Sequence, residues 1–318
     1  MPSVLKEILN RLVSLVIILF GLSILTFGLT YLLPSDPVEM LLESMGSGTD
    51  PEIVAALEES YGLDDPFIVQ YWNWLVGIFH GDFGTSVYYG EPVADVLARK
   101  LPNTVKLAVS SFILMILISF PLGILSAVYK NRIADYIIRF MSFLGISMPT
   151  FWFGMILIYI FAVQLGWLPV GGSDSLKCLI LPSITLAVTN SAYYIRRIRS
   201  VMLEQMNEEY ISGCRSRGMK KFRIIFFHVL PNSLLSIVTM LGMSFGSMLG
   251  GTMIVETVFS WNGIGKAAVE AISNRDYQLI QGYALWMGVI YVLVNLVVDI
   301  SYRWLDPRLR KGAVKSEK

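Results

Sequence analysis

The chain has few of the residues with which soluble proteins build catalytic or metal sites. Its 318 residues include two cysteines, two histidines and only 15% charged residues, whereas hydrophobic residues make up 54%. A soluble domain carries about 25% charged residues, so this composition excludes an ordinary water-soluble fold. Cys178 and Cys214 allow one disulfide at most and offer no redox or metal framework. We therefore expect an integral membrane protein without a resident cofactor.

Motifs for catalysis and nucleotide binding are missing as well. His80 and His228 have no carboxylate or cysteine neighbours at metal-ligand spacing. Residues 263–266 (Gly-Ile-Gly-Lys) look like part of a phosphate-binding loop. However, Ser260 replaces the first glycine of that loop and Ala267 replaces its hydroxyl residue that binds Mg²⁺. We expect no enzymatic activity and no nucleic-acid partner, so any ATP-driven work must be done by another polypeptide.

Long apolar runs are what the sequence has in abundance. A helix needs about 20 apolar residues to cross roughly 30 Å of hydrocarbon, and six runs meet this requirement. The first run is too long for a signal peptide and has no cleavage site after it, so we expect it to stay attached. The predicted fold class is an all-α protein of the cell membrane with six transmembrane helices. The predicted spans are Leu12–Leu33, Thr104–Tyr129, Tyr136–Leu165, Leu179–Ile195, Leu234–Val255 and Leu279–Tyr302.

Basic residues are distributed very unevenly between the two sides of these spans. Residues 1–11, 129–139, 196–231 and 303–318 hold 19 of the 25 Lys and Arg residues, while residues 34–98 hold none. Because cytoplasmic loops carry the excess of Lys and Arg, these four segments are predicted to be cytoplasmic. Both the N-terminus and the C-terminus are therefore expected inside the cell.

The hydrophilic segments give the domain organisation. We expect a cytoplasmic segment and the first span in residues 1–33, and an outer helical loop in residues 34–103. The transmembrane core with the second to sixth spans follows in residues 104–302, with a cytoplasmic loop at 196–231, and a cytoplasmic tail covers residues 303–318.

Asp-Pro pairs at 50–51 and 65–66 predict helix starts in the outer loop. An aromatic stripe at helical spacing follows the second pair. We expect it to rest on the membrane interface or on neighbouring outer helices, or alternatively to contact substrate. The stripe consists of Phe67, Tyr71, Trp74, Leu75 and Ile78.

The fifth span combines a glycine face with polar and methionine side chains. Gly242, Gly246 and Gly250 recur at four-residue spacing, which allows close helix packing in lipid. Two interpretations stay open, namely plain helix packing and the lining of a translocation path beside a partner helix. The candidate path residues are Ser244, Ser247, Met248, Thr252, Met253 and Glu256.

Charge and proline inside the spans are sparse. Asp299 is the clear intramembrane charge, and Arg303 four residues later can pair with it near the cytoplasmic interface. An ion-coupled secondary transporter, the alternative function, would need buried carboxylates paired with cations at the midplane, so it fits poorly. Pro149 and Pro182 are expected to kink the third and fourth spans, either for packing or as flexing points.

The cytoplasmic loop carries the most specific pattern. Residues 212–218 (Ser-Gly-Cys-Arg-Ser-Arg-Gly), nine further residues and residues 228–231 (His-Val-Leu-Pro) resemble the loop of permease subunits in bacterial ATP-binding-cassette (ABC) importers. The family's Glu-Ala-Ala triplet is replaced here, and so is the residue at His228, which is usual for the peptide and nickel branch. Further landmarks of that branch lie at residues 63–66, 70–71, 74–75, 81–86, 101–104, 148–152, 251–259, 275–277 and 306–308.

The resemblance implies a type I importer permease fold with a long first outer loop. It implies as partners a second homologous permease, two ATP-binding subunits and an extracytoplasmic solute-binding protein. The implied cargo is nickel, a nickel chelate, or di- or oligopeptides. The scarcity of histidine argues against a site for bare nickel ions.

The same resemblance implies that a short helix around Glu209–Arg217, ended by Gly218, docks on an ATPase and transmits its motion. Arg215 and Arg217 either rim that contact or only reflect the excess of positive charge inside. The implied coupling residues are Glu209, Tyr210, Ser212, Gly213, Cys214, Arg215, Arg217, Gly218, His228 and Pro231.

The predicted topology can be tested by cysteine labelling in intact membranes. Ser47→Cys and Ser316→Cys should react with an impermeant thiol reagent from opposite sides, because the intervening chain crosses the membrane an odd number of times. Labelling of both positions from the same side would contradict the six-span topology.

Overall fold

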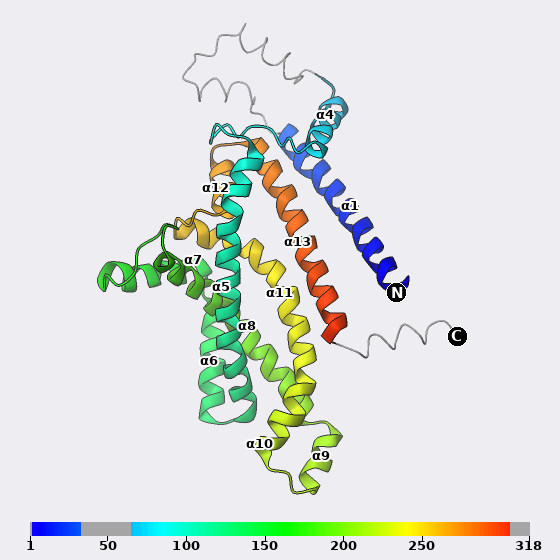
Figure 1. Ribbon diagram of the computed structural model, residues 1–318. Helices are drawn as coiled ribbons and strands as arrows, with labels where there is room; N and C mark the ends of the chain where they lie inside the picture. The colour runs from blue at the N-terminus through cyan, green and yellow to red at the C-terminus, as the bar shows by residue number, and fades with distance from the viewer. Residues whose placement is uncertain (1, 33–64, 306–318) are drawn as a thin grey trace. The chain divides into compact units, whose positions relative to one another are not determined.

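The computed structural model describes residues 2–32 and 65–305 and divides the chain into two compact units. The first unit comprises residues 1–102 and 263–293, and the second comprises residues 103–262 and 294–318. Every named element in the described ranges is helical (Figure 1). The all-α fold class predicted from the sequence is therefore confirmed.

Four helices are each long and apolar enough to cross a membrane, and two bent helix pairs bring the number of spans to six. The single helices are Val13–Tyr31, Val93–Val128, Leu176–Met206 and Tyr277–Val298. The bent pairs are Ile133–Ser147 with Thr150–Gln164, and Lys221–Leu234 with Ser236–Gly250. Each of the six overlaps one of the apolar runs, so sequence hydropathy locates the spans correctly.

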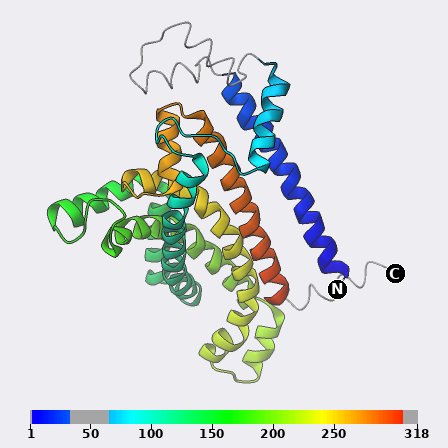
Figure 2. The same cartoon turned by 45° about the horizontal axis from the view of Figure 1, so that its top comes forward.

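In the first unit, α1 (Pro2–Tyr31) packs along α4 (Phe67–Phe79), as both views show (Figures 1 and 2). The Phe27 ring of α1 lies 5.5 Å from the Phe67 and Tyr71 rings and 5.3 Å from the Trp74 ring, measured between centroids. The Tyr71 hydroxyl also lies 2.8 Å from the Ser23 hydroxyl, within hydrogen-bonding distance. The aromatic stripe of α4 therefore packs on the first transmembrane helix, whereas the sequence led us to expect the membrane interface or outer helices.

The rest of this unit is built from the start of α5 (Val93–Val128), from α12 (Ile264–Ser273) and from the start of α13 (Tyr277–Leu305). Their apolar side chains share one core, in which Val93, Leu97 and Leu279 are fully buried. α5 begins at Val93, well before the predicted second span starts at Thr104. The helix includes Pro102 and the charged residues that precede it.

The second unit contains the remainder of α5 and the helices from α6 to α11. These are α6 (Ile133–Ser147), α7 (Thr150–Leu157), η1 (Ile158–Gln164), α8 (Leu176–Met206), α9 (Glu209–Ser216), α10 (Lys221–Ile224), η2 (Ile225–Val229) and α11 (Leu230–Val258). Both η segments are π-helical turns. α8 contacts α6, α7, η2 and α11, and thirteen of its residues are buried, so it forms the centre of this unit.

The two prolines of the spans have different effects. α6 ends at Ser147, before Pro149, and α7 continues at an angle of 104°, which is a break rather than the predicted kink. Proline disfavours the helical conformation in the residue before it, and Met148 accordingly adopts an extended conformation. α8, by contrast, runs without interruption through Pro182.

Two glycines allow α5 and α6 to approach α8 closely. A Cβ atom on Gly123 of α5 would lie 2.8 Å from Cβ of Ile198, and one on Gly145 of α6 would lie 2.9 Å from Cβ of Ala192. Neither separation leaves room for a side chain. On the predicted glycine face of α11, a Cβ on Gly250 would meet nothing within 4 Å. Gly246 on the same face is buried, whereas Gly250 is exposed.

Gly123→Ala should destabilise the protein by about 1–3 kcal/mol, because the added methyl group overpacks the contact between α5 and α8. The unfolding temperature in detergent measures this effect. Gly21→Ala in α1 is the matched control, since its Cβ would meet nothing within 4 Å. Equal unfolding temperatures for the two variants would contradict the close contact.

Candidate functional site

The predicted coupling helix is present as α9, eight residues between α8 and α10. It lies with α10 at the lower end of the second unit in Figure 1. Ile211 is almost fully buried in the core of that unit and Cys214 is half-buried, while Glu209, Tyr210 and the residues on the opposite face are exposed. The helix is thus anchored on one side and open to a partner on the other.

Gly218 lies just after the end of this helix, where the resemblance implies that the helix ends. Its φ angle is +74°, in the left-handed region that favours glycine. The Gly218 amide donates to the Arg215 carbonyl at 2.9 Å, and the Met219 amide donates to the Cys214 carbonyl at 3.2 Å. These two bonds satisfy carbonyl groups that the last helical turn leaves free.

Behind α9 lies a pocket of about 330 Å³ that separates it from α10 and η2. Its walls are mainly apolar, and Arg215 and Lys221 supply the charged groups. The lining residues are Met206, Ile211, Arg215, Met219, Lys221, Ile224, Ile225 and Val229.

The second half of the loop pattern forms the start of the fifth span. His228 lies in the π-helical turn η2, and Pro231 is in the first turn of α11, which follows η2 directly. The Asn232 side chain donates to the His228 carbonyl at 2.9 Å and to the Tyr210 hydroxyl at 3.3 Å. One side chain therefore links the first residues of α9 to the root of α11.

The candidate path residues of α11 are mostly buried among the chain's own helices. Ser244, Met248, Thr252 and Glu256 are buried, and Glu256 accepts a hydrogen bond of 2.7 Å from Thr104 of α5. Ser244 bonds to Tyr194 of α8. Met253 is half-buried. Burial favours the packing interpretation for the four buried residues, and the path remains a prediction.

Two sequence-based predictions fall on side chains that the structure does not describe. These are the Ser247 hydroxyl on α11 and the proposed Asp299–Arg303 pair on α13. Among residues 2–32 and 65–305, no cluster of three or more His, Cys, Asp or Glu side chains could hold a metal ion.

A polar hub in the first unit joins two landmark segments, and sequence reasoning did not identify it. Asp276 is almost fully buried and accepts hydrogen bonds from the Ser86 hydroxyl, the Tyr88 amide and the Leu279 amide. The bond to Leu279 caps the N-terminus of α13. The only sequence signal for this contact is that residues 81–86 and 275–277 are both family landmarks.

A second polar contact lies beside this hub. The Tyr89 hydroxyl donates to the Glu270 carboxylate, and the Lys100 ammonium lies 4.7 Å from the centroid of the Tyr89 ring. Burial, reinforced by the hydrogen bond to Glu270, raises the pKa of the Tyr89 phenol above its usual range, so it stays neutral.

Two family models match successive parts of the chain. Residues 119–311 match the model of the binding-protein-dependent transport system inner membrane component, and residues 4–108 match that of the N-terminal part of such membrane components. The chain belongs to this family. It is a permease component of an ABC importer and a protein of the inner membrane.

Curated relatives match this permease over almost its whole length. The oligopeptide transport system permease protein AppB of Bacillus subtilis is 40% identical, over 95% of this chain and 98% of the relative. The probable D,D-dipeptide transport system permease protein DdpB of Escherichia coli is 37% identical, over 95% and 97%. The glutathione transport system permease protein GsiC of Salmonella choleraesuis is 36% identical, over 96% and 99%.

Solved structures confirm the type I importer fold. An inward-facing structure of the MetNI methionine ABC transporter matches with a TM-score of 0.56 and 17% identity, over 66% of this chain and 96% of that one. An amino acid ABC transporter with histidines matches with a TM-score of 0.53 and 17% identity, over 66% and 94%.

Thr252→Trp tests whether α11 lines a path or packs within the permease. Because Thr252 is buried at 1% exposure, the indole should overpack the helix contact, and we expect the amount of assembled importer to fall together with transport. The yield of intact complex from membranes measures the loss. Thr257→Trp on the exposed face of the same helix is the control. An assembled Thr252→Trp complex that hydrolyses ATP but accumulates no cargo would instead support a path.

Proposed function

We propose that this permease moves di- or oligopeptides into the cytoplasm, driven by ATP hydrolysis in separate ATPase subunits that contact α9. The observation that carries the cargo is the set of relatives. Permeases for a D,D-dipeptide, for oligopeptides and for glutathione are each 36–40% identical over at least 95% of this chain. All three cargoes contain amide-linked amino acids. Nickel, the other cargo considered from the sequence, has no counterpart among these three relatives.

The geometry of α9 supports a contact with an ATPase. Its exposed face carries Glu209, Tyr210, Ser212 and Arg215, a mixed polar and aromatic set suited to the rim and centre of a protein interface. Its other face is fixed to the core by Ile211. A push on α9 would therefore move the helices behind it rather than unfold the loop.

The remaining assembly follows from the family. We propose that a second homologous permease, two ATP-binding subunits and an extracytoplasmic solute-binding protein complete the importer. Residues 34–103 would form the outer segment, residues 196–231 the coupling loop, and both termini would be cytoplasmic. The exposed surface at Gly250, where a Cβ would have no neighbour, is available for contact with another helix.

Gly218→Val tests the coupling proposal in the purified importer. The left-handed conformation at Gly218 costs a residue with a side chain about 1 kcal/mol or more, and a β-branched one costs most, so α9 should lose its end and its orientation. We expect the permease to insert normally, bind less ATPase and lose uptake. Gly166→Val is the matched control, because Gly166 also has a left-handed φ angle of 62°, lies outside the coupling loop, and a Cβ there would meet nothing within 4 Å.

Uptake of labelled cargo into proteoliposomes distinguishes the substrates in the same preparation. We expect a dipeptide or glutathione to be accumulated with ATP and the binding protein, and excess nickel not to compete. Normal uptake by the Gly218→Val importer would remove α9 from the mechanism, and ATP-dependent accumulation of nickel alone would overturn the proposed cargo.

A further inference from the structure

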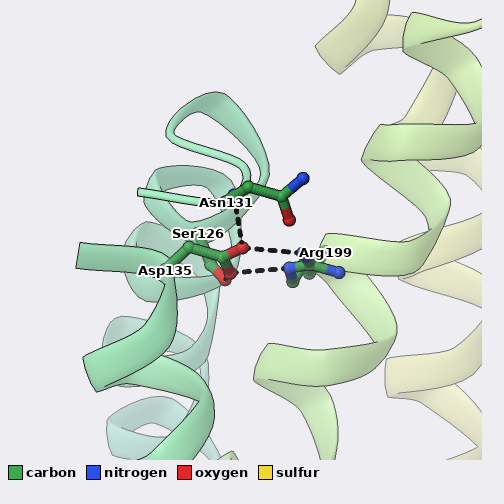
Figure 3. A network of polar contacts seen from close by, with 4 residues as sticks. All are labelled: Ser126, Asn131, Asp135 and Arg199. Atoms are coloured by element: carbon green, nitrogen blue, oxygen red, sulfur yellow. Dashed lines mark hydrogen bonds and ion pairs between the residues drawn. The ribbon is translucent and has the colours of Figure 1, made fainter. Parts of the chain in front are cut away.

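A single buried carboxylate ties the turn between α5 and α6 to α8 (Figure 3). Asp135, in the first turn of α6, is fully buried. The Arg199 guanidinium of α8 donates from Nε to Oδ1 at 2.8 Å and from Nη2 to Oδ2 at 2.7 Å. The Ser126 hydroxyl of α5 donates to Oδ1 at 2.6 Å, and the Asn131 amide in the turn donates to Oδ2 at 2.9 Å. One side chain thus joins α5, the turn, α6 and α8.

The geometry of this contact makes it stiff. A planar guanidinium that donates two parallel bonds to a carboxylate fixes orientation as well as distance, which a lysine ammonium does not. Asn131 holds its amide toward the carboxylate with a φ angle of 61°, in the left-handed region that asparagine tolerates better than most residues. Removing one partner would leave the other charge in a site from which water is largely excluded.

The same hairpin is also held at three other points. The close approaches of Gly123 to Ile198 and of Gly145 to Ala192 press the backbones of α5 and α6 onto α8. Beyond the turn, the Lys221 ammonium of α10 donates to the Val128 carbonyl at the end of α5 at 3.1 Å. The hairpin is therefore joined both to α8 and to the loop that contains α9.

A continuous set of contacts leads from α9 to this pair. Ile211 of α9 shares a core with Met202 and Met206, on the last turns of α8 beyond Arg199. On the other side, α6 continues through the break at Pro149 into α7, which contacts α8 and α11. Packed elements with low compressibility can carry a displacement along such a route.

We propose that the Asp135–Arg199 pair is a positioning element of energy coupling, which makes the α5–α6 hairpin move as one body with α8 when α9 is displaced. This inference rests on the proposed function of α9. The pair touches neither cargo nor ATP. It acts by keeping α6, and through α6 also α7, in a fixed position relative to α8, the helix that moves when α9 is displaced.

The test measures how many ATP molecules are hydrolysed per cargo molecule accumulated, in importer purified through a tag on this chain and reconstituted with the binding protein. Arg199→Lys keeps the charge but loses the paired bonds, and Asp135→Asn keeps the shape but loses the ion pair. We expect both variants to retain ATPase activity and to raise the ratio by about threefold or more. Arg196→Lys, an exposed arginine on the same helix end, is the matched control and should leave the ratio unchanged.

A purely structural role predicts a different result. Loss of folded complex would lower hydrolysis and uptake in proportion, so an unchanged ratio in Arg199→Lys and Asp135→Asn overturns the proposal. If the single variants fail to assemble, the double variant Asp135→Leu with Arg199→Met leaves no unpaired charge and is measured instead. We expect a raised ratio there too, because two aliphatic chains do not fix orientation, and failure of all three to assemble also overturns it.

The measurement is separate from the test of the coupling helix. The ratio is determined only in complexes that contain bound ATPase, so normal ATPase binding with an unchanged ratio contradicts the role of Asp135 and Arg199 alone. Normal uptake by Gly218→Val contradicts the role of α9, whatever the ratio in the other variants.

Discussion

The packing of α8 against the α5–α6 hairpin is the contact on which the second unit depends. In lipid there is little hydrophobic drive for one helix to prefer another, so association relies on close fit and on polar bonds between helices. Both are concentrated here, in the glycine contacts at Gly123 and Gly145 and in the carboxylate of Asp135. α11 and α7 then pack on other sides of the same helix. A soluble protein can stabilise its helix contacts through a large apolar core, whereas this permease relies on close contacts and polar bonds at a few positions.

The coupling loop combines this rigidity with an exposed surface. α9 is short, and an isolated helix of eight residues is unstable in water. It is held by a buried isoleucine, by the bonds around Gly218 and by Asn232 at the root of α11. A docking element of this kind can be solvent-exposed without being flexible, which is what transmission of a displacement requires.

Hydropathy, helix-ending signals and family landmarks predict much of this structure. The six spans, the limits of α9 and the left-handed Gly218 follow from local sequence, because each depends on residues close together in the chain. The Asp135–Arg199 pair does not, since its partners are 64 residues apart and nothing local marks either one. The periodic glycines of α11 differ from one another for a similar reason, since Gly246 is buried and Gly250 is exposed although both lie on the predicted face. Spacing shows which residues share a face, but not whether a neighbour occupies it. For the same reason, spacing does not show that neighbouring helices bury Thr252 and Glu256.

The polar hub around Asp276 has a consequence for the order of synthesis. Ser86 and Asp276 are 190 residues apart, and the first unit is assembled from the two ends of the chain, while residues 103–262 form the bulk of the second unit without a gap. At about 5–20 residues per second, a ribosome needs roughly 10–40 s to add the missing partner. During that interval the Ser86 loop is without its acceptor. Residues 103–262 of the second unit can therefore begin to pack in the membrane before the first unit is complete, and the synthesis of Asp276 at the start of α13 completes the hub.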